Sequence, residues 1–286
     1  MSSAGIILCE CTEVYNVLNQ AGQYPRLSDP NYLLLLDTRE NHDYSESHVI
    51  TAKFAPRNDI GAFTVPNDAE LETKEHVVIY DSSTSSLKDK SGYEEFSALY
   101  PFLRTQKIIY MPRELDVIST YPLEIIPGFL FVATFQLSQD RRIIKDLKVK
   151  ANVIVGKEND TVFAPESTTL GREDKRVKQI LRVPIDDNGE EDLFSHLSDI
   201  VNFIDDHQTK DGRTLLLSSS LGISRSLTVA IAYYMWNKKV SLKDAYNHLK
   251  KCRENMQPTR GFIEQLSRWE EKMFGSLVTD ISEPEY

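Results

Sequence analysis

The chain has 286 residues and a formal net charge of −10, from 33 lysines and arginines against 43 aspartates and glutamates. This acidic balance argues against nucleic acid or an anionic membrane as the main partner. The apolar fraction of 41% and the charged fraction of 27% are typical of a soluble globular protein, and the length is sufficient for two domains.

Three cysteines, Cys9, Cys11 and Cys252, form a sparse and odd set that favours a reducing compartment. Cys9 and Cys11 have no second pair or histidine cluster nearby, so we predict no metal site and no cofactor. No apolar run reaches membrane-spanning length, and the N-terminus lacks the basic region of a secretory signal. We therefore expect a cytoplasmic protein without membrane insertion, and leave an association with mitochondria open.

The first half of the chain predicts strands alternating with helices. The expected elements are a helix over residues 6–20, a buried strand over 32–36, an acidic helix after it, a strand over 77–80 and a helix from residue 92. The first strand is followed by Asp37-Thr38-Arg39 and, after the acidic helix, by Ser47-His48-Val49. This order resembles the opening of a rhodanese domain, and VVIYD at 77–81 is similar to a later strand of that family. We expect Asp37, His42 and His48 to be structural.

Two departures from the rhodanese pattern affect the expected function. The loop Asp81–Ser86 carries no cysteine, so sulfur transfer is not expected. About ten residues separate Asp81 from Gly92, where a full domain places a helix and another strand. The domain is therefore predicted to be shortened and to expose strand edges. The segment 52–58 has only Lys53 and Arg57 as basic residues, which argues against a kinase-docking cluster of the kind found in MAP kinase phosphatases.

The second half of the chain predicts an α/β sheet covered by helices on both faces. Residues 104–122 are interpreted as a linker, and residues 123–133 as a hairpin that turns at Pro127-Gly128. Beyond the hairpin, apolar spacing predicts helices over 137–147, 192–207, 242–252 and 261–274, and strands over 151–155 and 180–185. Ser241 precedes the third of these helices as its start signal, with Asp244 shortly after it. The acidic residues after Leu277 are expected to be disordered.

The stretch Leu215–Tyr234, LLLSSSLGISRSLTVAIAYY, predicts a buried strand, a tight loop and a helix that starts inside the core. Such a loop directs backbone N–H groups into one small space, and the helix dipole adds partial positive charge there. Gly222 allows a tight turn or a close approach to a ligand. Arg225 can close the space as a planar, two-pronged donor. The stretch therefore predicts a site for a dianion such as phosphate.

The same residues resemble the loop of protein tyrosine phosphatases and their dual-specificity branch, which reads His-Cys, five residues, Arg and usually Ser. The resemblance implies a phosphate-binding loop made of Ser219, Ser220, Leu221, Gly222, Ile223, Ser224 and Arg225. Here, however, Ser219 holds the cysteine position and Ser218 the histidine position. A serine hydroxyl keeps its proton where a cysteine becomes a thiolate, and no histidine adjoins Ser219 as a base. We predict that the loop holds phosphate without cleaving it.

Residues 183–188 resemble the acid loop of the family, which implies that Asp187 is the remnant of its general acid. Bland alternatives stay open: the adjacent aspartates could form a solvated turn, Arg225 could be a structural tie, and the serine-rich loop could be an ordinary turn. Ser224 is expected to cap the helix that follows it. Pro258–Phe262 departs from the family's Pro-Asn pattern, so the support of the loop from that side is open.

We predict an α/β protein with an N-terminal segment (1–27), a shortened rhodanese-like domain (28–103), a linker (104–122), a dual-specificity phosphatase-like domain (123–275) and a tail (276–286). This order is similar to that of the STYX-type pseudophosphatases. The resemblance implies an inactive scaffold that binds phosphorylated proteins, or partner phosphatases or kinases, and so modulates signalling. The alternatives are a weakly active phosphatase with a non-cysteine nucleophile, and a protein whose partners bind its outer helices without phosphate.

Overall fold

The computed structural model describes residues 8–22, 24–65, 71, 73–82, 92–108, 114–115, 118–157, 177, 179–211 and 214–282. The chain divides into two compact units, Met1–Thr120 and Tyr121–Tyr286, and each is described by itself. Both combine parallel strands with helices, as the sequence predicts.

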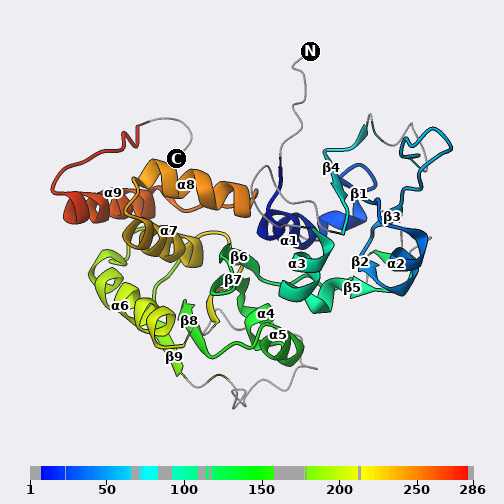
Figure 1. The fold of residues 1–286 in the computed structure, drawn as a ribbon. Helices are drawn as coiled ribbons and strands as arrows, with labels where there is room; N and C mark the ends of the chain where they lie inside the picture. The colour runs from blue at the N-terminus through cyan, green and yellow to red at the C-terminus, as the bar shows by residue number, and fades with distance from the viewer. Residues whose placement is uncertain are drawn as a thin grey trace. The chain divides into compact units, whose positions relative to one another are not determined.

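The first unit is built around a short parallel sheet in the strand order β3-β1-β4 (Figure 1). Its helices are α1 (Cys11–Asn19), η1 (Arg26–Ser28), α2 (Asn41–Glu46), α3 (Tyr93–Leu99) and η3 (Pro101–Leu103). Its strands are β1 (Leu33–Asp37), β2 (His48–Val49), β3 (Lys53–Phe54), β4 (His76–Tyr80) and β5 (Arg104–Thr105). β2 and β5 form a separate antiparallel pair. The linker predicted from residue 104 therefore begins with a strand of this unit.

Among the described residues, β4 lies at one end of the sheet of the first unit. β1 lies between β3 and β4, so β4 ends the sheet on one side. The side chains of Val77 and Ile79 on β4 are 41% and 64% exposed. Both apolar side chains lack the cover that a further strand and helix supply in a longer sheet.

A buried ion pair holds the end of β1. Arg39 donates to both carboxylate oxygens of Asp37, with its terminal nitrogen 2.6 Å from Oδ2, and Tyr80 donates to the same oxygen at 2.7 Å. The Arg39 guanidinium also lies 3.5 Å from the centre of the Tyr93 ring. Burial, and then the charge of Asp37, raise the pKa of Tyr80. Asp37 is thus structural, as predicted, because its charge is fully paired in a closed cluster.

The second unit contains a five-stranded sheet in the order β6-β7-β10-β8-β9. Its strands are β6 (Leu123–Ile126), β7 (Leu130–Thr134), β8 (Ala151–Val155), β9 (Gln179–Val183) and β10 (Leu215–Ser219). Its helices are α4 (Phe135–Gln139), α5 (Arg141–Asp146), α6 (Phe194–Asp211), α7 (Arg225–Lys238), α8 (Leu242–Cys252) and α9 (Arg260–Phe274). β6 and β7 form the predicted antiparallel hairpin, and the other pairs are parallel.

The core of the second unit surrounds α7. This helix packs against α6, α8, α9 and β10 (Figure 1), and its residues from Arg225 to Tyr233 are buried on every side. A helix that is apolar all round requires such cover, and the sequence from Leu227 onward supplies it. Because α7 is fixed on all faces, the loop that leads into it has a fixed place.

Two sequence predictions for this unit are wrong. The single helix predicted over 137–147 is two helices, because Asp140 has an extended backbone and its carboxylate accepts from the N–H of Arg142 at 2.7 Å. The predicted disorder after Leu277 does not hold for residues 278–282, because the buried Glu270 carboxylate accepts hydrogen bonds from Val278 and Thr279. These contacts anchor the chain beyond the last helix.

Candidate functional site

The loop 219–225 lies where a phosphate site is expected in an α/β unit. It joins the carboxyl end of β10 to the first turn of α7. β10 is the central strand and runs parallel to β7 on one side and β8 on the other. Ligands of parallel sheets bind at the carboxyl ends of central strands, and the N-terminus of a long helix favours an anion.

The backbone of the loop passes close to the end of β7 at Gly222. Gly222 has a φ of +66°, and a Cβ atom there would lie 2.8 Å from the carbonyl oxygen of Ala133. Among the described residues, none accepts a hydrogen bond from the backbone N–H groups of residues 220–224. A row of available N–H donors beside a helix N-terminus is the arrangement that binds tetrahedral anions.

The two serines at the start of the loop are buried and bonded to neutral groups. The Ser219 hydroxyl lies 2.9 Å from the hydroxyl of Ser226 in the first turn of α7. The Ser218 hydroxyl donates to the side-chain oxygen of Asn152 at 3.0 Å. Neither contact is to a basic group, so among the described residues nothing accepts the Ser219 proton as a general base.

Arg225 ties the loop to the acid loop. Its guanidinium donates to the carbonyl oxygen of Ile185 at 3.0 Å, and its Nε lies 3.8 Å from Oδ2 of Asp187. The side chain is 5% exposed. Arg225 therefore has the structural role that the sequence left open, because it connects the two loops. Its guanidinium also places a positive charge at the base of the loop 219–225.

Ser224 occupies the N-cap position of α7, but its side chain makes no capping hydrogen bond, so the expectation that its hydroxyl caps the helix is wrong. Its hydroxyl donates to Oδ1 of Asp187 at 2.5 Å, whereas its backbone oxygen accepts from the N–H of Thr228. Asp187 thus contacts Ser224 and Arg225 together. It is not a freely solvated turn residue, although its side chain is 37% exposed.

The acid loop is held from its outer side by charged groups. Lys157 Nζ lies 2.5 Å from Oδ2 of Asp186 and 2.5 Å from Oε1 of Glu191. The hydrogen bond from Lys157 is the main cause that lowers the pKa of Asp186. The other carboxylate oxygen of Glu191 accepts from the backbone N–H of Asp186 at 3.0 Å. Asp186 therefore faces Lys157, while its neighbour Asp187 faces the phosphate-type loop.

The acid loop also touches the start of α9 backbone to backbone. A Cβ atom on Gly261 would lie 2.1 Å from the carbonyl oxygen of Gly189, so only glycine fits at this contact. Gln265 on the same helix donates to the carbonyl oxygen of Glu191 at 2.9 Å. On the side that departs from the Pro-Asn pattern, the N–H of Gln257 donates to the carbonyl oxygen of Ile223 at 2.8 Å. The loop 219–225 is therefore supported there by a backbone hydrogen bond.

Sequence reasoning missed several of these partners. Asn152 lies inside the strand β8, where only its polarity among apolar residues marks it. Ser226 follows Arg225 directly, and the family pattern names it without giving it a role. The contact between Gly189 and Gly261 joins residues 72 positions apart (261 − 189), which no local pattern reveals.

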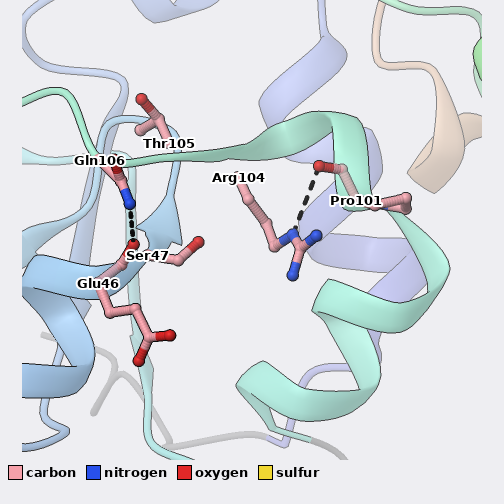
Figure 2. Close-up of a pocket in the computed structure, with 6 residues that line it drawn as sticks. All are labelled: Glu46, Ser47, Pro101, Arg104, Thr105 and Gln106. Atoms are coloured by element: carbon pink, nitrogen blue, oxygen red, sulfur yellow. Dashed lines mark hydrogen bonds between the residues drawn. The ribbon is translucent and has the colours of Figure 1, made fainter.

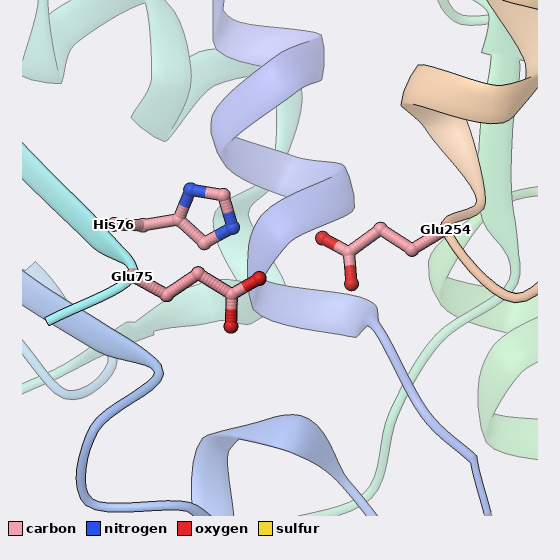
Figure 3. A group of neighbouring side chains, drawn as sticks. All are labelled: Glu75, His76 and Glu254. Carbon is pink, nitrogen blue, oxygen red and sulfur yellow. The ribbon is translucent and has the colours of Figure 1, made fainter. Parts of the chain in front are cut away.

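Two other groups of side chains lie outside this site. The first unit has a hollow of about 390 Å³. Figure 2 shows the residues that line it: Glu46, Ser47, Pro101, Arg104, Thr105 and Gln106. Arg104 and Gln106 donate there to backbone oxygens of the same unit, which is a structural arrangement. Figure 3 shows Glu75 and His76 of the first unit and Glu254 of the second. Because these side chains belong to separate units, we assign no metal site to them. Within the described residues, no helix is long and apolar enough to cross a membrane.

Comparison with known families identifies the second unit. Residues 130–272 match the family described as dual specificity phosphatase, catalytic domain. The chain belongs to the dual specificity phosphatase family, and the matched residues include the acid loop, β10, the loop 219–225 and α7.

The relatives extend the similarity into the first unit. The "Probable rhodanese domain-containing dual specificity protein phosphatase" of Dictyostelium discoideum is 28% identical over 200 residues, which cover 69% of this chain and 40% of that protein. Human dual specificity protein phosphatase 16 is 25% identical over 285 residues, covering 84% of this chain and 41% of that protein. The chain spans about two fifths of the length of these two relatives.

Solved structures are similar over about half of the chain. The crystal structure of human DUSP28 is 27% identical with a TM-score of 0.47, and covers 54% of this chain and 98% of that one. The human tyrosine phosphatase-like serine/threonine/tyrosine-interacting protein is 24% identical with a TM-score of 0.45, and covers 55% of this chain and 99% of that one. The predicted fold class, an α/β chain with a rhodanese-like N-terminal part and a dual-specificity phosphatase-like domain, is confirmed.

Proposed function

We propose that this protein is a STYX-type pseudophosphatase, which binds phosphorylated groups in the loop 219–225 and does not hydrolyse them. Its partners are phosphorylated proteins, or phosphatases or kinases of the same signalling system, and it modulates their signalling as a scaffold. The first unit is proposed as a shortened rhodanese-like domain without sulfur transfer.

The observation that carries this proposal is the contact between the hydroxyls of Ser219 and Ser226, at the position where the family resemblance implies a thiolate. In this setting the helix dipole, the loop N–H groups and the arginine stabilise a thiolate, so they lower the pKa of a thiol and its proton is released to water. An alcohol starts from a far higher pKa, so it needs a neighbouring base to attack phosphorus. The described neighbours of Ser219 supply a hydroxyl instead.

Binding is tested by calorimetry with a phosphotyrosine peptide and its unphosphorylated counterpart. Only the phosphorylated peptide is expected to release heat, and Arg225→Ala is expected to abolish that heat because it removes the cation at the loop. Arg225→Lys keeps the charge but not the two-pronged geometry, and should bind with intermediate affinity. Arg268→Ala is the matched control, since it removes a cation from α9 that lies over Phe194. Equal heat from both peptides would contradict a phosphate site.

Inactivity is tested by the hydrolysis of an aryl phosphate. The wild type is expected to show no turnover above background, whereas the paired change Ser218→His and Ser219→Cys should recover measurable turnover. The recovery requires Ser224 to turn from Asp187 toward the new thiolate. Wild-type turnover that disappears in Arg225→Ala would favour the alternative, a weak phosphatase with a non-cysteine nucleophile. A pull-down that compares wild type with Arg225→Ala then separates phosphate-dependent partners from those bound by other surfaces.

A further inference from the structure

The acid loop places a carboxylate against the two residues that end the phosphate-type loop. Asp187 Oδ1 accepts from the Ser224 hydroxyl at 2.5 Å, and Oδ2 lies 3.8 Å from Nε of Arg225. The guanidinium of Arg225 also donates to the carbonyl oxygen of Ile185, two residues before Asp187. Ser224 and Arg225 are thus both engaged by the segment 185–187.

We propose that Asp187 is an internal ligand of the loop 219–225, and that a phosphate group binds there in competition with the Asp187 carboxylate. The inference rests on the proposed phosphate-binding function and adds its regulation. Without a partner, the loop 219–225 is then occupied by the Asp187 carboxylate. A phosphorylated partner binds by displacing that carboxylate.

The competition follows from the number of donors. A hydroxyl has one proton to donate, and that of Ser224 is given to Asp187, so it is not available to an incoming oxyanion. A carboxylate beside Arg225 also offsets the positive charge that would attract phosphate. A dianion that enters beside Asp187 meets a like charge, which raises the free energy of the bound state.

The supports of the acid loop keep Asp187 in this place. Lys157 holds Asp186 and Glu191 on the outer side, and the Gly189–Gly261 contact fixes the end of the loop against α9. The Asp187 side chain itself is 37% exposed, so it has room to leave the contact without unfolding the loop. The Asp187 side chain can therefore move, whereas the backbone of the acid loop is held in place.

The test is calorimetric titration of the full chain with inorganic phosphate at pH 7 and fixed ionic strength. Asp187→Asn removes the charge but keeps an oxygen that can accept from Ser224, and Asp187→Ala removes both. Each is expected to tighten phosphate binding, Asp187→Ala by about tenfold, which corresponds to ~1.4 kcal/mol. Glu190→Gln is the matched control, because it removes the same charge from the same exposed loop without a described side-chain contact. Its affinity should stay within about twofold of wild type.

The outcomes separate this inference from the proposed function. Tighter binding in Asp187→Ala alone, or in both Asp187 variants, supports the inference, and so does binding that appears only in these variants. Unchanged affinity in both Asp187 variants, with binding lost in Arg225→Ala, overturns the inference and leaves the proposed function standing. Equal tightening in Glu190→Gln also overturns it, because the effect is then one of net charge. No binding in any variant overturns the proposed function as well. Tryptophan fluorescence confirms that each variant is folded.

Discussion

The contact between the acid loop and α9 gives a quantitative prediction for Gly261→Ala. The new Cβ would lie 2.1 Å from the carbonyl oxygen of Gly189, which is 0.9 Å short of the 3.0 Å that real Cβ atoms keep (3.0 − 2.1). The opposing atom is backbone, so the loop that carries Asp187 must move. Overpacking of this kind costs about 1–3 kcal/mol. The higher helix propensity of alanine over glycine offsets less than about 1 kcal/mol of this cost, since residue 261 is only the second residue of α9. We expect a net loss of about 1–2 kcal/mol in the free energy of unfolding.

Urea unfolding followed by tryptophan fluorescence measures this loss in the second unit alone, because both tryptophans, Trp236 in α7 and Trp269 in α9, lie there. The matched control is Gly22→Ala in the first unit, where a Cβ meets nothing within 4 Å and the tryptophan signal should not change. An unfolding free energy for Gly261→Ala equal to or above that of wild type would refute the reasoning. It would mean that the two backbones do not press on one another.

Three further predictions concern charged groups of the second unit. Glu270→Gln should lower the unfolding free energy by about 2–4 kcal/mol in the same urea assay, because the buried carboxylate accepts four hydrogen bonds. The control is the exposed Glu264→Gln, which should change the unfolding free energy by less than about 0.5 kcal/mol. Burial lowers the pKa of Arg253 to about 10, and among the described residues it has no ion-pair partner, so Arg253→Met should stabilise the unit at pH 7; a lower urea midpoint would contradict this. Lys157→Met should raise the pKa of Asp186 toward its ordinary value, as followed by NMR titration of the carboxyl group. Because the wild-type pKa is lowered, the stabilisation by this pair is present above the ordinary carboxyl pKa and is lost as the pH falls through the lowered one.

The elements that carry a local pattern were predictable from the sequence. The apolar run LLL before the serines gives β10, and Ser241 caps α8 as its spacing indicates, accepting from the N–H of Asp244 at 3.1 Å. The split at Asp140 was missed because helix periodicity continues through it, while its capping geometry competes with the helix. The anchored tail was missed because its partner, Glu270, is buried by tertiary contacts that an acidic segment does not reveal.

The sequence indicated which segments form the candidate site, but not which side chains bond to one another there. The strand-loop-helix pattern predicts the loop from Ser219 to Arg225, and the family resemblance implies Asp187 as its neighbour. The hydroxyl of Ser224, however, was expected to cap α7, and the structure turns it to Asp187 instead. That choice depends on where the acid loop lies, which the Gly189–Gly261 contact and Gln265 set from α9. Such contacts between distant residues arise from tertiary packing, so the sequence of neither segment predicts them.

The central claim is that the loop holds a phosphate group without accepting it covalently. Intact-mass spectrometry of the full chain after incubation with excess aryl phosphate tests this most directly, because a phosphoserine formed at Ser219 would be a stable ester and would accumulate. The mass of the wild-type chain is expected to stay unchanged. A mass increase of one phosphoryl group that maps to Ser219 and disappears in Arg225→Ala would contradict the claim.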